Sequence, residues 1–434
     1  MVFIMLDKVF VLRNEENGNV AFNIENLESD RLSDREVLML YEYYKSGRLN
    51  DCSPKVKEDI VRFNKKTDQT NIVSEPYDMP LSPTIVISHD CNYNCSYCFE
   101  KDFRKSGVIT PEHINNIEAF LDIYSKHYGV EKKYGGISIV GGEPFLPSNM
   151  PIISTIHEHW KDQAFQYTTN GTNILMFSEI LKRAKKLRLK ISIDGTKQMH
   201  LAKRATNNSS LYDETIKGLK WAISSEIETI VLSVFHPDLL DSYPQYFDML
   251  ENLGWLTKSN LKLAFLLKMD SGCDDIDRKY ILDVNKALIA LKKNDSRINN
   301  ASITKLIPGA NALSRALISK ALGHKLTTYA CEALFAATFT FAPDGCVYFC
   351  NATRSKQGRI GLFYPHVEVD FHMLDILRKR NVLNMSQCKN CKYRFVCGGG
   401  CPVSSIKHYS DVEHPFCSYW KDPEIIALFE TVLA

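Results

Sequence analysis

Strand-like and helix-like segments alternate between residues 84 and 270, and this alternation constrains the fold more than any other feature of the chain. Six runs rich in β-branched and aromatic residues recur there, namely "TIVISHD", "GGISIVGGE", "FQYTTNGT", "RLKISIDGT", "IETIVLSVFHP" and "NLKLAFLLK". Helical stretches such as "PEHINNIEAFLDIYSK" and "LYDETIKGLKWAISS" separate them. The pattern predicts an α/β fold whose parallel strands are joined by right-handed crossovers. Because six units are fewer than the eight of a closed barrel, we expect a partial (β/α)6 TIM-like barrel.

Polar or glycine-rich segments follow four successive predicted strands. The first strand leads directly into "CNYNCSYC", and the next three end in "GGEP", "TTNG" and "SIDG". Each of the last three segments, taken alone, is also compatible with an ordinary turn between a strand and a helix. Ligands of parallel α/β folds bind at the carboxyl ends of the strands, where the four segments would meet. Together they predict one binding site at the mouth of the barrel.

The cysteines of the first segment favour an iron–sulfur cluster. Cys91, Cys95 and Cys98 have the spacing C-x3-C-x2-C, which is short enough for three thiols to converge on one group. A structural zinc site normally has four ligands and a disulfide needs two cysteines, whereas three thiolates suit a four-iron cluster that leaves one iron open. The alternative is that packing alone buries these cysteines.

Composition and charge restrict the class of protein. The chain has 434 residues, and its net charge of +2, from 53 basic and 51 acidic residues, predicts neither nucleic acid nor an anionic membrane as a partner. No apolar run approaches the roughly 20 residues of a membrane span, and the amino terminus lacks the basic region of a secretory signal. Thirteen cysteines in such a chain predict metal or redox chemistry in the reducing cytoplasm.

Residues 1–66 predict a small separate module. Two apolar runs in "KVFVLRNEENGNVAFNIEN" flank an Asn-Gly turn and predict a hairpin. Two helices follow, with Ser33 as the N-cap of the first and Pro54 at the start of the second. We expect the remaining parts to be a proline-containing linker at 67–83, the barrel at 84–270, a bridging helical region at 271–325 and a Cys-rich region at 326–434.

The Cys-rich region has a second motif. Four of its cysteines, in "CKNCKYRFVCGGGC", are spaced C-x2-C-x5-C-x3-C, and three more flank this segment. A pair of structural zinc sites is the alternative to iron–sulfur clusters, since C-x2-C is common to both metals. The seven cysteines are Cys331, Cys350, Cys388, Cys391, Cys397, Cys401 and Cys417.

Seven ligands are one fewer than two four-iron clusters need, and Cys346 is a candidate for the eighth. The segment "TFAPDGCVYFC" predicts a hairpin that turns at Pro343-Asp344-Gly345. On a regular strand Cys346 and Cys350 share a face but stand roughly 13 Å apart, at about 3.3 Å per residue. This separation is too long for one cluster unless a bulge bends the strand.

The motifs "CNYNCSYC", "GGEP", "TTNG" and "SIDG", in this order, resemble those of radical S-adenosylmethionine enzymes, over roughly residues 84–270. The resemblance implies that the first cluster binds the amino and carboxylate groups of S-adenosylmethionine and cleaves it to a 5′-deoxyadenosyl radical. It implies that Glu143 accepts a hydrogen bond from the amino group and that Tyr97 lies by the adenine. The other implied ligand contacts are Gly141, Gly142, Asn170, Ser192, Asp194 and Arg204, the last of which would pair with the carboxylate.

The seven C-terminal cysteines resemble a SPASM domain, which holds auxiliary clusters in peptide and protein maturases of this family. The resemblance implies three 4Fe–4S clusters in all. It assigns Cys388, Cys391, Cys397 and Cys417 to one auxiliary cluster, and Cys331, Cys350 and Cys401 to the other.

These resemblances predict a maturase of ribosomally made peptides. Its N-terminal module would bind the leader of a precursor peptide as an added strand, and a flavodoxin- or ferredoxin-type protein would supply electrons. A thioether crosslink is the first choice of product, because an open iron on the three-cysteine cluster would bind a substrate thiol. The alternatives are an anaerobic sulfatase maturase that makes formylglycine and a non-catalytic iron–sulfur protein that binds peptides or carries electrons.

Overall fold

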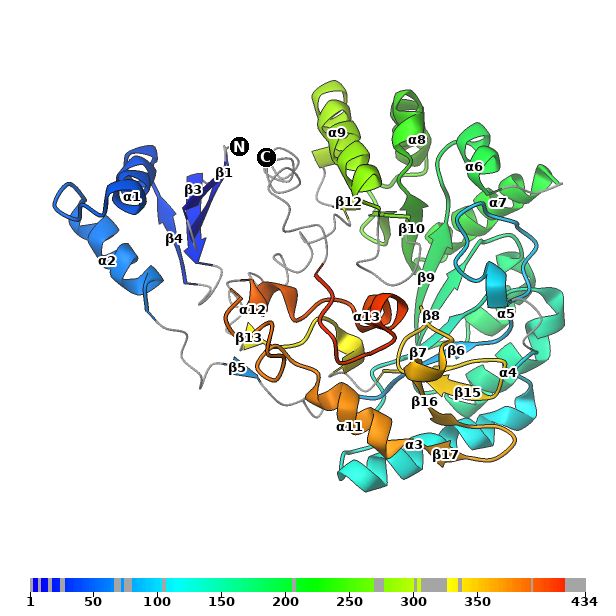
Figure 1. Ribbon diagram of the computed structural model, residues 1–434. Coiled ribbons are helices and arrows are strands. Elements are labelled where there is room, and N and C mark those ends of the chain that lie inside the picture. The colour runs from blue at the N-terminus through cyan, green and yellow to red at the C-terminus, as the bar shows by residue number, and fades with distance from the viewer. Residues whose placement is uncertain are drawn as a thin grey trace.

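A computed structural model gives the structure of the chain. It describes residues 3–6, 9–14, 18–23, 28–65, 72–73, 80–103, 107–204, 208–268, 277–299, 303–305, 326–334, 338–391 and 393–417. Figure 1 shows a small N-terminal module to one side, a curved sheet with helices along its outer face, and the Cys-rich region next to that sheet.

The N-terminal module is a four-stranded antiparallel sheet packed against two helices. The predicted hairpin is confirmed, and Asn14 pairs with Gly18 at its end. A strand on each side of it, which sequence reasoning did not predict, completes the sheet in the order β1-β2-β3-β4. The elements are β1 (Phe3–Leu6), β2 (Val9–Asn14), β3 (Gly18–Asn23), β4 (Ser29–Leu32), α1 (Asp34–Ser46) and α2 (Pro54–Phe63).

Both helices of the module begin where their capping residues predicted. The Ser33 hydroxyl accepts a hydrogen bond from the Glu36 amide at 3.3 Å, and the Glu36 carboxylate accepts one from the Ser33 amide at 2.7 Å. This reciprocal pair satisfies two amides that a helix start otherwise leaves open. Pro54 occupies the first turn of α2, where its missing N–H costs nothing. Val11, Leu40 and Ile60, all buried, belong to the core between sheet and helices.

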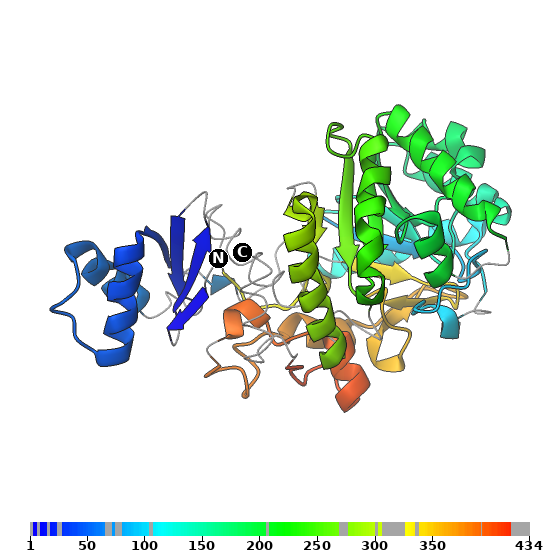
Figure 2. The same cartoon turned by 90° about the horizontal axis from the view of Figure 1, so that it is seen from above.

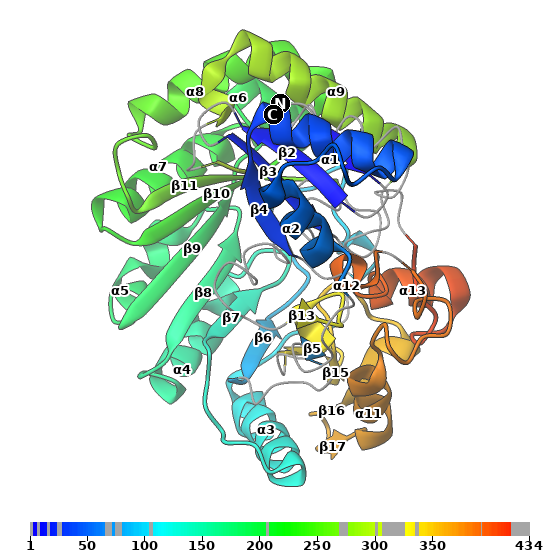
Figure 3. The ribbon, with the colours of Figure 1, turned by 90° about the vertical axis from the view of Figure 1, so that its left-hand side faces the viewer.

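The six predicted barrel strands are all present and parallel, each next to its neighbour in the chain. Helices cover the convex face of the curved sheet, as Figure 3 shows. The strands are β6 (Ser82–Val86), β7 (Ile137–Val140), β8 (Ala164–Thr169), β9 (Lys186–Ser192), β10 (Glu228–Val234) and β11 (Leu261–Leu266). The helices are α3 (Ile114–Tyr128), α4 (Met150–His159), α5 (Ser178–Leu181), α6 (Lys197–Lys203), α7 (Ser210–Ser224), α8 (Tyr243–Asn252) and α9 (Arg278–Asn294).

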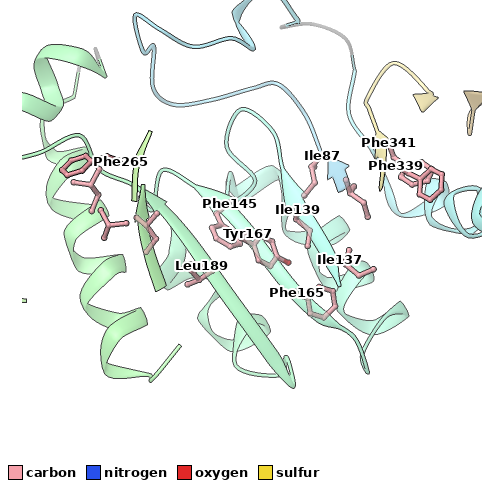
Figure 4. Close-up of a cluster of buried hydrophobic side chains, with 14 of the residues drawn as sticks. Ile87, Ile137, Ile139, Phe145, Phe165, Tyr167, Leu189, Phe265, Phe339 and Phe341 are labelled. Atoms are coloured by element: carbon pink, nitrogen blue, oxygen red, sulfur yellow. The ribbon is translucent and has the colours of Figure 1, made fainter. Parts of the chain in front are cut away.

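Alternate residues of the strands form the main core. Ile137 and Ile139 of β7, Phe165 and Tyr167 of β8, and Leu189 of β9 are all at most 2% exposed. Figure 4 shows these side chains in one continuous cluster. Burial of one face holds the register of each strand, because a shift by one residue would turn the apolar side chains away from the core.

The Cys-rich region continues the barrel sheet. β14 (Thr338–Phe341) pairs in parallel with β6, and β15 (Cys346–Tyr348), β16 (Arg359–Leu362) and β17 (Glu368–Val369) follow antiparallel. The predicted hairpin between β14 and β15 is confirmed, with Gly345 at φ +80° in its turn. Phe339 and Phe341 pack edge-on against Phe120 of α3, with ring centroids 5.9 and 5.6 Å away. At the other edge β12 (Ile303–Lys305) pairs with β11.

Short elements connect these parts. β5 (Ile72–Val73) pairs in parallel with β13 (Leu326–Thr327), so the segment predicted as a linker contains one short strand. The remaining helices are α11 (Phe371–Lys379), α12 (Arg394–Cys397) and α13 (Pro402–Tyr409). The 3-10 helices are η2 (Lys101–Phe103), η3 (Pro111–His113), η4 (Pro147–Asn149), η5 (Ile174–Phe177), η6 (Pro237–Ser242), η7 (Ser296–Asn299), η8 (Glu332–Leu334) and η9 (Lys356–Gly358). Across the described part of the chain, no helix has both the length and the apolar character of a membrane span.

Candidate functional site

The loop that carries Cys91, Cys95 and Cys98 lies against the end of the neighbouring strand β7. The amide of Gly142 donates to the Ser88 carbonyl at 2.9 Å, and the amide of Glu143 donates to the Asp90 carbonyl at 2.8 Å. These bonds hold the start of the loop, which is referred to below as the cysteine loop (residues 87–100), at the carboxyl edge of the sheet. The sequence prediction that the first two strand ends meet is therefore confirmed.

Gly141 and Gly142 make this close approach possible. A Cβ atom at Gly142 would stand 2.3 Å from the Asp90 carbonyl oxygen, and one at Gly141 would stand 2.3 Å from that of Ser88. Gly141 also has φ +142°, which side chains disfavour. In this structure the backbone that comes close to the two glycines is that of the cysteine loop.

Glu143 is fully buried and is held by three donors. Its Oε1 atom accepts from the Phe145 amide at 2.9 Å and the Thr169 hydroxyl at 2.6 Å, and Oε2 accepts from the Asn170 amide at 2.6 Å. Burial raises the pKa of this carboxyl to about 7, against the opposing effect of these hydrogen bonds. The carboxylate thus links the ends of β7 and β8 at a point next to Cys91.

Asn170 ties the end of β8 to the cysteine loop. Its Nδ2 atom donates to Asn92 Oδ1 at 2.7 Å and lies 3.9 Å from the Cys91 sulfur. Asn92 in turn donates to the Thr172 hydroxyl at 2.9 Å. Sequence reasoning missed Asn92 and Thr172, although both lie inside the motifs that it selected.

Asp194 is the centre of a buried charged group at the end of β9. Its Oδ2 atom is 2.9 Å from Arg204 Nε, it accepts a hydrogen bond from the Tyr97 hydroxyl, and its Oδ1 accepts from the Val234 amide at 3.0 Å. Burial acts to raise the pKa of Asp194, but the Arg204 charge, together with His236 and the Tyr97 hydroxyl, outweighs burial and holds the pKa well below its usual range. The Arg204 guanidinium also lies 5.6 Å from the centre of the Tyr97 ring. The predicted pairing of Arg204 with a ligand carboxylate stays a prediction.

His236 joins this group from the end of β10, and sequence reasoning missed it. Its ring lies 5.6 Å from that of Tyr97, and its Nε2 atom, which has no hydrogen-bond partner, is 3.7 Å from Asp194 Oδ2. The same rule that selected the other strand ends applies to "VFHPD", so this signal was available. Ser192, in contrast, is half-buried on β9 two residues before Asp194.

A cavity of about 740 Å³ opens beside Tyr97 and His236. Ser96 and Lys203 form part of its wall, and residues from the ends of β10 and β11 and from α9 form the rest. It is therefore bordered by the cysteine loop on one side and by the helix after the last barrel strand on the other. Its further lining residues are Pro237, Asp238, Leu240, Lys268, Tyr280, Asp283, Lys286 and Ala287.

The thiols of the cysteine loop lie near one another, with Cys95 buried and Cys91 and Cys98 half-buried. The pKa of Cys91 is raised to about 12. Burial is the largest cause, followed by the charge of Glu143 and by the thiols of Cys95 and Cys98. Burial also raises the pKa of Cys95. Thiols that disfavour ionisation in this way become thiolates when they bind a metal, because the metal supplies the missing positive charge. The donor set fits a metal centre.

His89 is the one histidine of the cysteine loop, two residues before Cys91. Its ring lies 5.7 Å from that of Phe103, and its Nδ1 atom is 3.4 Å from the buried Glu100 carboxylate. It thus faces away from the pairing that links Glu143 and Asn170.

The cysteines of the C-terminal region form a second group. The pKa of Cys331 is raised to about 12, first by burial and then by the thiols of Cys401 and Cys350. Burial raises the pKa of Cys350 to about 11. Cys331 directly precedes η8, Cys350 follows β15 and Cys401 is the N-cap of α13, so the fold brings together the set of three that the resemblance implied. Cys388 is buried, Cys391 and Cys397 are half-buried, and Cys417 is exposed.

Cys346 lies elsewhere. Burial raises the pKa of its thiol, and the groups that act on it next are Asp344, Tyr348 and Arg359. A bulge follows Val347, as the sequence prediction required for a contact with Cys350, but the side chain stays among these residues of the hairpin and β16. Two further cysteines are unassigned: Cys52 is buried in the N-terminal module, and Cys273 lies outside the described residues.

No three His, Cys, Asp or Glu side chains in the described ranges are arranged to hold a single metal ion. A four-iron cluster does not require that arrangement, because each thiolate binds a different iron atom. The two cysteine groups therefore fit clusters by their donor type and burial.

Comparison with known proteins agrees with this site. Residues 85–250 match the model of the radical SAM superfamily. The radical SAM cyclopropyl synthase TigE of Paramaledivibacter caminithermalis is 23% identical over 356 residues, which are 76% of this chain and 69% of TigE. A GTP 3′,8-cyclase of Helicobacter pylori is 25% identical over 195 residues, which are 43% of this chain and 55% of the cyclase.

Two solved structures have the same fold. The structure of anSMEcpe with bound AdoMet (S-adenosylmethionine) has a TM-score of 0.58 at 18% identity and covers 82% of this chain and 97% of its own. Streptococcus suis SuiB bound to the precursor peptide SuiA has a TM-score of 0.54 at 15% identity and covers 95% and 98%. The matched residues 85–250 contain the cysteine loop, Glu143, Asn170 and Asp194. Residues 85–250 therefore form a domain of the radical SAM superfamily within this chain.

Proposed function

We propose that this enzyme matures a ribosomally made precursor peptide by forming a thioether crosslink. The observation that carries the proposal is a site in which the cysteine loop and Glu143 meet at the barrel mouth, within one chain that also brings the thiols of Cys331, Cys350 and Cys401 near one another. The first half of this arrangement suits radical formation, and the second suits capture of a thiol and acceptance of an electron.

Cys91, Cys95 and Cys98 would hold a four-iron cluster and Glu143 would accept from the amino group of S-adenosylmethionine. Bound in this way, S-adenosylmethionine supplies a 5′-deoxyadenosyl radical. The cavity beside Tyr97 and His236 has the position for the adenosyl part, next to an aromatic ring and an imidazole Nε2 atom without a partner. Arg204, Asn170, Ser192 and the glycines stay proposals as ligand contacts.

The cysteines of the C-terminal region would hold two auxiliary clusters, one on Cys388, Cys391, Cys397 and Cys417 and one on the other three. Since the described structure adds no fourth cysteine to the set of three, one iron would be open to a substrate thiol. Thioether formation breaks one C–H bond and one S–H bond and makes one C–S bond. The hydrogen atom would go to the deoxyadenosyl radical, the thiol proton would leave to solvent, and a cluster held by Cys331, Cys350 and Cys401 would accept the remaining electron.

The N-terminal module would hold the leader of the precursor. Its four-stranded sheet has two edges, β1 and β4, to which an extended peptide can add as a fifth strand. SuiB, which has the same fold over 95% of this chain, is known with a bound precursor peptide. A flavodoxin- or ferredoxin-type protein would supply the electron for cleavage of S-adenosylmethionine.

The test is spectroscopic and uses two peptides. Enzyme with reduced auxiliary clusters is mixed with a core peptide that contains cysteine, or with the same peptide in which serine replaces cysteine. We expect only the cysteine peptide to change the paramagnetic spectrum of one auxiliary cluster, and the product to lose one pair of hydrogen atoms. Cys346→Ala is the matched variant and should change neither the iron content nor the response to peptide.

Loss of iron in Cys346→Ala, with no response to either peptide, would show that the cluster is closed and would remove the basis of the thioether. Conversion of the peptide cysteine to formylglycine would instead identify a sulfatase-maturase activity. That outcome also separates the alternatives by mass, because formylglycine replaces the thiol sulfur by oxygen.

A further inference from the structure

Arg380 lies between the two groups of C-terminal cysteines. It follows α11 directly and is 2% exposed. Burial has the largest effect on the pKa of Arg380. The next largest effects come from four thiols, those of Cys331, Cys401, Cys397 and Cys388. Two of these belong to each proposed cluster, so the guanidinium stands where both ligand sets are within electrostatic reach.

Every hydrogen-bond acceptor of Arg380 is neutral. The guanidinium contacts three segments, because its bonds run to the last two of the three glycines before Cys401, to Ser405 of α13 and to the segment after that helix. The acceptors are Val412 O at 2.6 Å from Nε, Gly400 O at 3.0 Å from Nη1, and Gly399 O, Ser405 Oγ and His414 O at 3.2, 3.1 and 3.3 Å from Nη2. None of the described carboxylates forms an ion pair with Arg380.

A buried guanidinium without an anion is unfavourable, because the protein interior solvates a charge poorly. Two other arginines in the described part of the chain, the buried Arg204 and the half-buried Arg354, show the usual solution. Arg204 pairs with Asp194 at 2.9 Å, and Arg354 lies within electrostatic reach of Glu100 and Asp344. Arg380 has only the cysteines, and these become anionic when they bind iron. The counter-charge of Arg380 is therefore supplied by the ligands of the proposed clusters.

We propose that Arg380 is the counter-ion of the two auxiliary clusters and raises their reduction potentials. The inference rests on the proposed function, since it assumes that these cysteines bind clusters. A fixed positive charge favours the reduced state of a cluster, which carries one more negative charge than the oxidised state. Arg380 would thereby make the auxiliary clusters better acceptors for the electron that crosslink formation releases.

Arg380 is also a positioning residue. Gly398, Gly399 and Gly400, which separate Cys397 from Cys401, all have positive φ values, and Arg380 bonds two of their carbonyls. The side chain thus holds the turn that joins a ligand of one cluster to a ligand of the other. A purely structural role would affect cluster retention but not the potential of retained clusters, so the two roles can be separated.

The experiment measures midpoint potentials in a background that lacks the first cluster, Cys91→Ala with Cys95→Ala and Cys98→Ala. Its iron content is determined first. Iron and sulfide for two clusters establish the auxiliary sites, whereas absence of iron would contradict the proposed function itself before Arg380 is changed. Arg380→Met, Arg380→Gln and Arg380→Lys are then compared with Arg378→Met, which removes an arginine of α11 that lies 4.3 Å from the Tyr128 ring.

We expect Arg380→Met to reduce the ratio of reduced to oxidised cluster at a fixed potential at least tenfold, which is about 59 mV for a one-electron couple. Arg380→Lys keeps the charge and should stay near the parent, as should Arg378→Met. If the Arg380→Met protein does not retain its clusters, Arg380→Gln takes its place in the comparison of potentials, because Gln is neutral but still donates hydrogen bonds. Parent-like potentials in a neutral variant overturn the proposal, and so does loss of clusters in all three variants including Lys. Retention of the clusters in Arg380→Lys but in neither neutral variant supports the proposal.

Discussion

Glu143 illustrates how single residues of the barrel mouth are prepared for a ligand. Full burial favours its neutral form, whereas three donated hydrogen bonds and the nearby Arg204 favour the carboxylate. With a pKa of about 7, Glu143 changes charge near neutral pH. A ligand ammonium group would shift this balance toward the carboxylate.

Replacement of Glu143 by Gln should weaken binding of S-adenosylmethionine by about 10- to 100-fold, because a hydrogen bond to a charged group contributes about 1.5–3 kcal/mol. Equilibrium binding to the reconstituted enzyme measures this loss. Glu118→Gln is the control, since Glu118 contacts Tyr134 and Trp160 on the outer side of the sheet. Equal affinities in both variants would contradict the role of Glu143.

The same residue predicts a pH dependence. Affinity of the wild-type enzyme should fall as the pH decreases through about 7, because protonation removes the carboxylate that accepts from the ligand amino group. The Glu143→Gln enzyme should lack this component of the profile. Binding titrations between pH 6 and about 8 test it, and an unchanged profile in the variant would assign the titration to another group.

Asp194 makes a contribution to stability that Asn cannot replace. Asp194→Asn leaves the buried Arg204 charge without its partner, which typically costs about 3–5 kcal/mol. Thermal unfolding followed by circular dichroism should show a clearly lower Tm. Lys197→Met, which breaks the exposed pair with Asp213, should cost at most about 1 kcal/mol.

The sign of the pH effect follows from the lowered pKa of Asp194. Its stabilisation is fully present above the unfolded-state value of about 3.9 and is lost only as the pH falls through the lower folded-state pKa. The difference in stability between wild type and Asp194→Asn should therefore persist across neutral pH. A difference that disappears at neutral pH would mean that Arg204 has another counter-ion.

At the scale of elements, the cysteine loop depends on the strands beside it. β7 holds the loop through the amides of Gly142 and Glu143, and β8 holds it through Asn170. The loop lacks a regular hydrogen-bonded structure of its own along most of its length, so these bonds determine where its thiols lie.

Gly142→Ala should displace the cysteine loop and remove the first cluster. The new Cβ atom would stand 2.3 Å from one backbone oxygen of the loop and 2.5 Å from another, and backbone atoms cannot move aside as a side chain does. We expect the loss of about one cluster of iron, with 5′-deoxyadenosine formation lost as well. Gly135→Ala is the control. Its added Cβ atom would stand 3.1 Å or more from the nearest atoms, which are two side-chain atoms and one backbone oxygen. Full iron content in Gly142→Ala would contradict this dependence.

At the scale of the whole molecule, the barrel and the Cys-rich region share one sheet, whereas the N-terminal module has its own sheet and core. Figure 2 shows the module to the side of the barrel in a second view. Removal of the module should therefore leave the barrel folded, because the main core contains none of its side chains.

Deletion of residues 1–66 should weaken binding and turnover of a full-length precursor while S-adenosylmethionine cleavage without peptide continues. Binding is measured by fluorescence anisotropy of a labelled precursor and cleavage by 5′-deoxyadenosine formation. A leaderless core peptide is the control, because its turnover should be similar with and without the module. Unchanged affinity for the full precursor after the deletion would make the module structural.

The features that could be predicted from the amino-acid sequence are those that short segments encode. The alternation of strands and helices, the capping residues Ser33 and Pro54, the hairpin turn at Gly345 and the cysteine spacings were all predicted, since each depends on neighbours within a few residues. The four selected strand ends pointed to the mouth of the barrel because parallel strands share one edge.

The contacts between distant segments could not be predicted from the sequence and are seen in the folded structure. It placed β14 beside β6, brought His236 and Tyr97 to Asp194, and left Arg380 among cysteines without a carboxylate. These contacts join residues that are up to about 250 positions apart, and no local periodicity records such a pairing. They arise because the buried apolar faces must pack together, and each buried charge must then meet whatever counter-charge the packing brings to it.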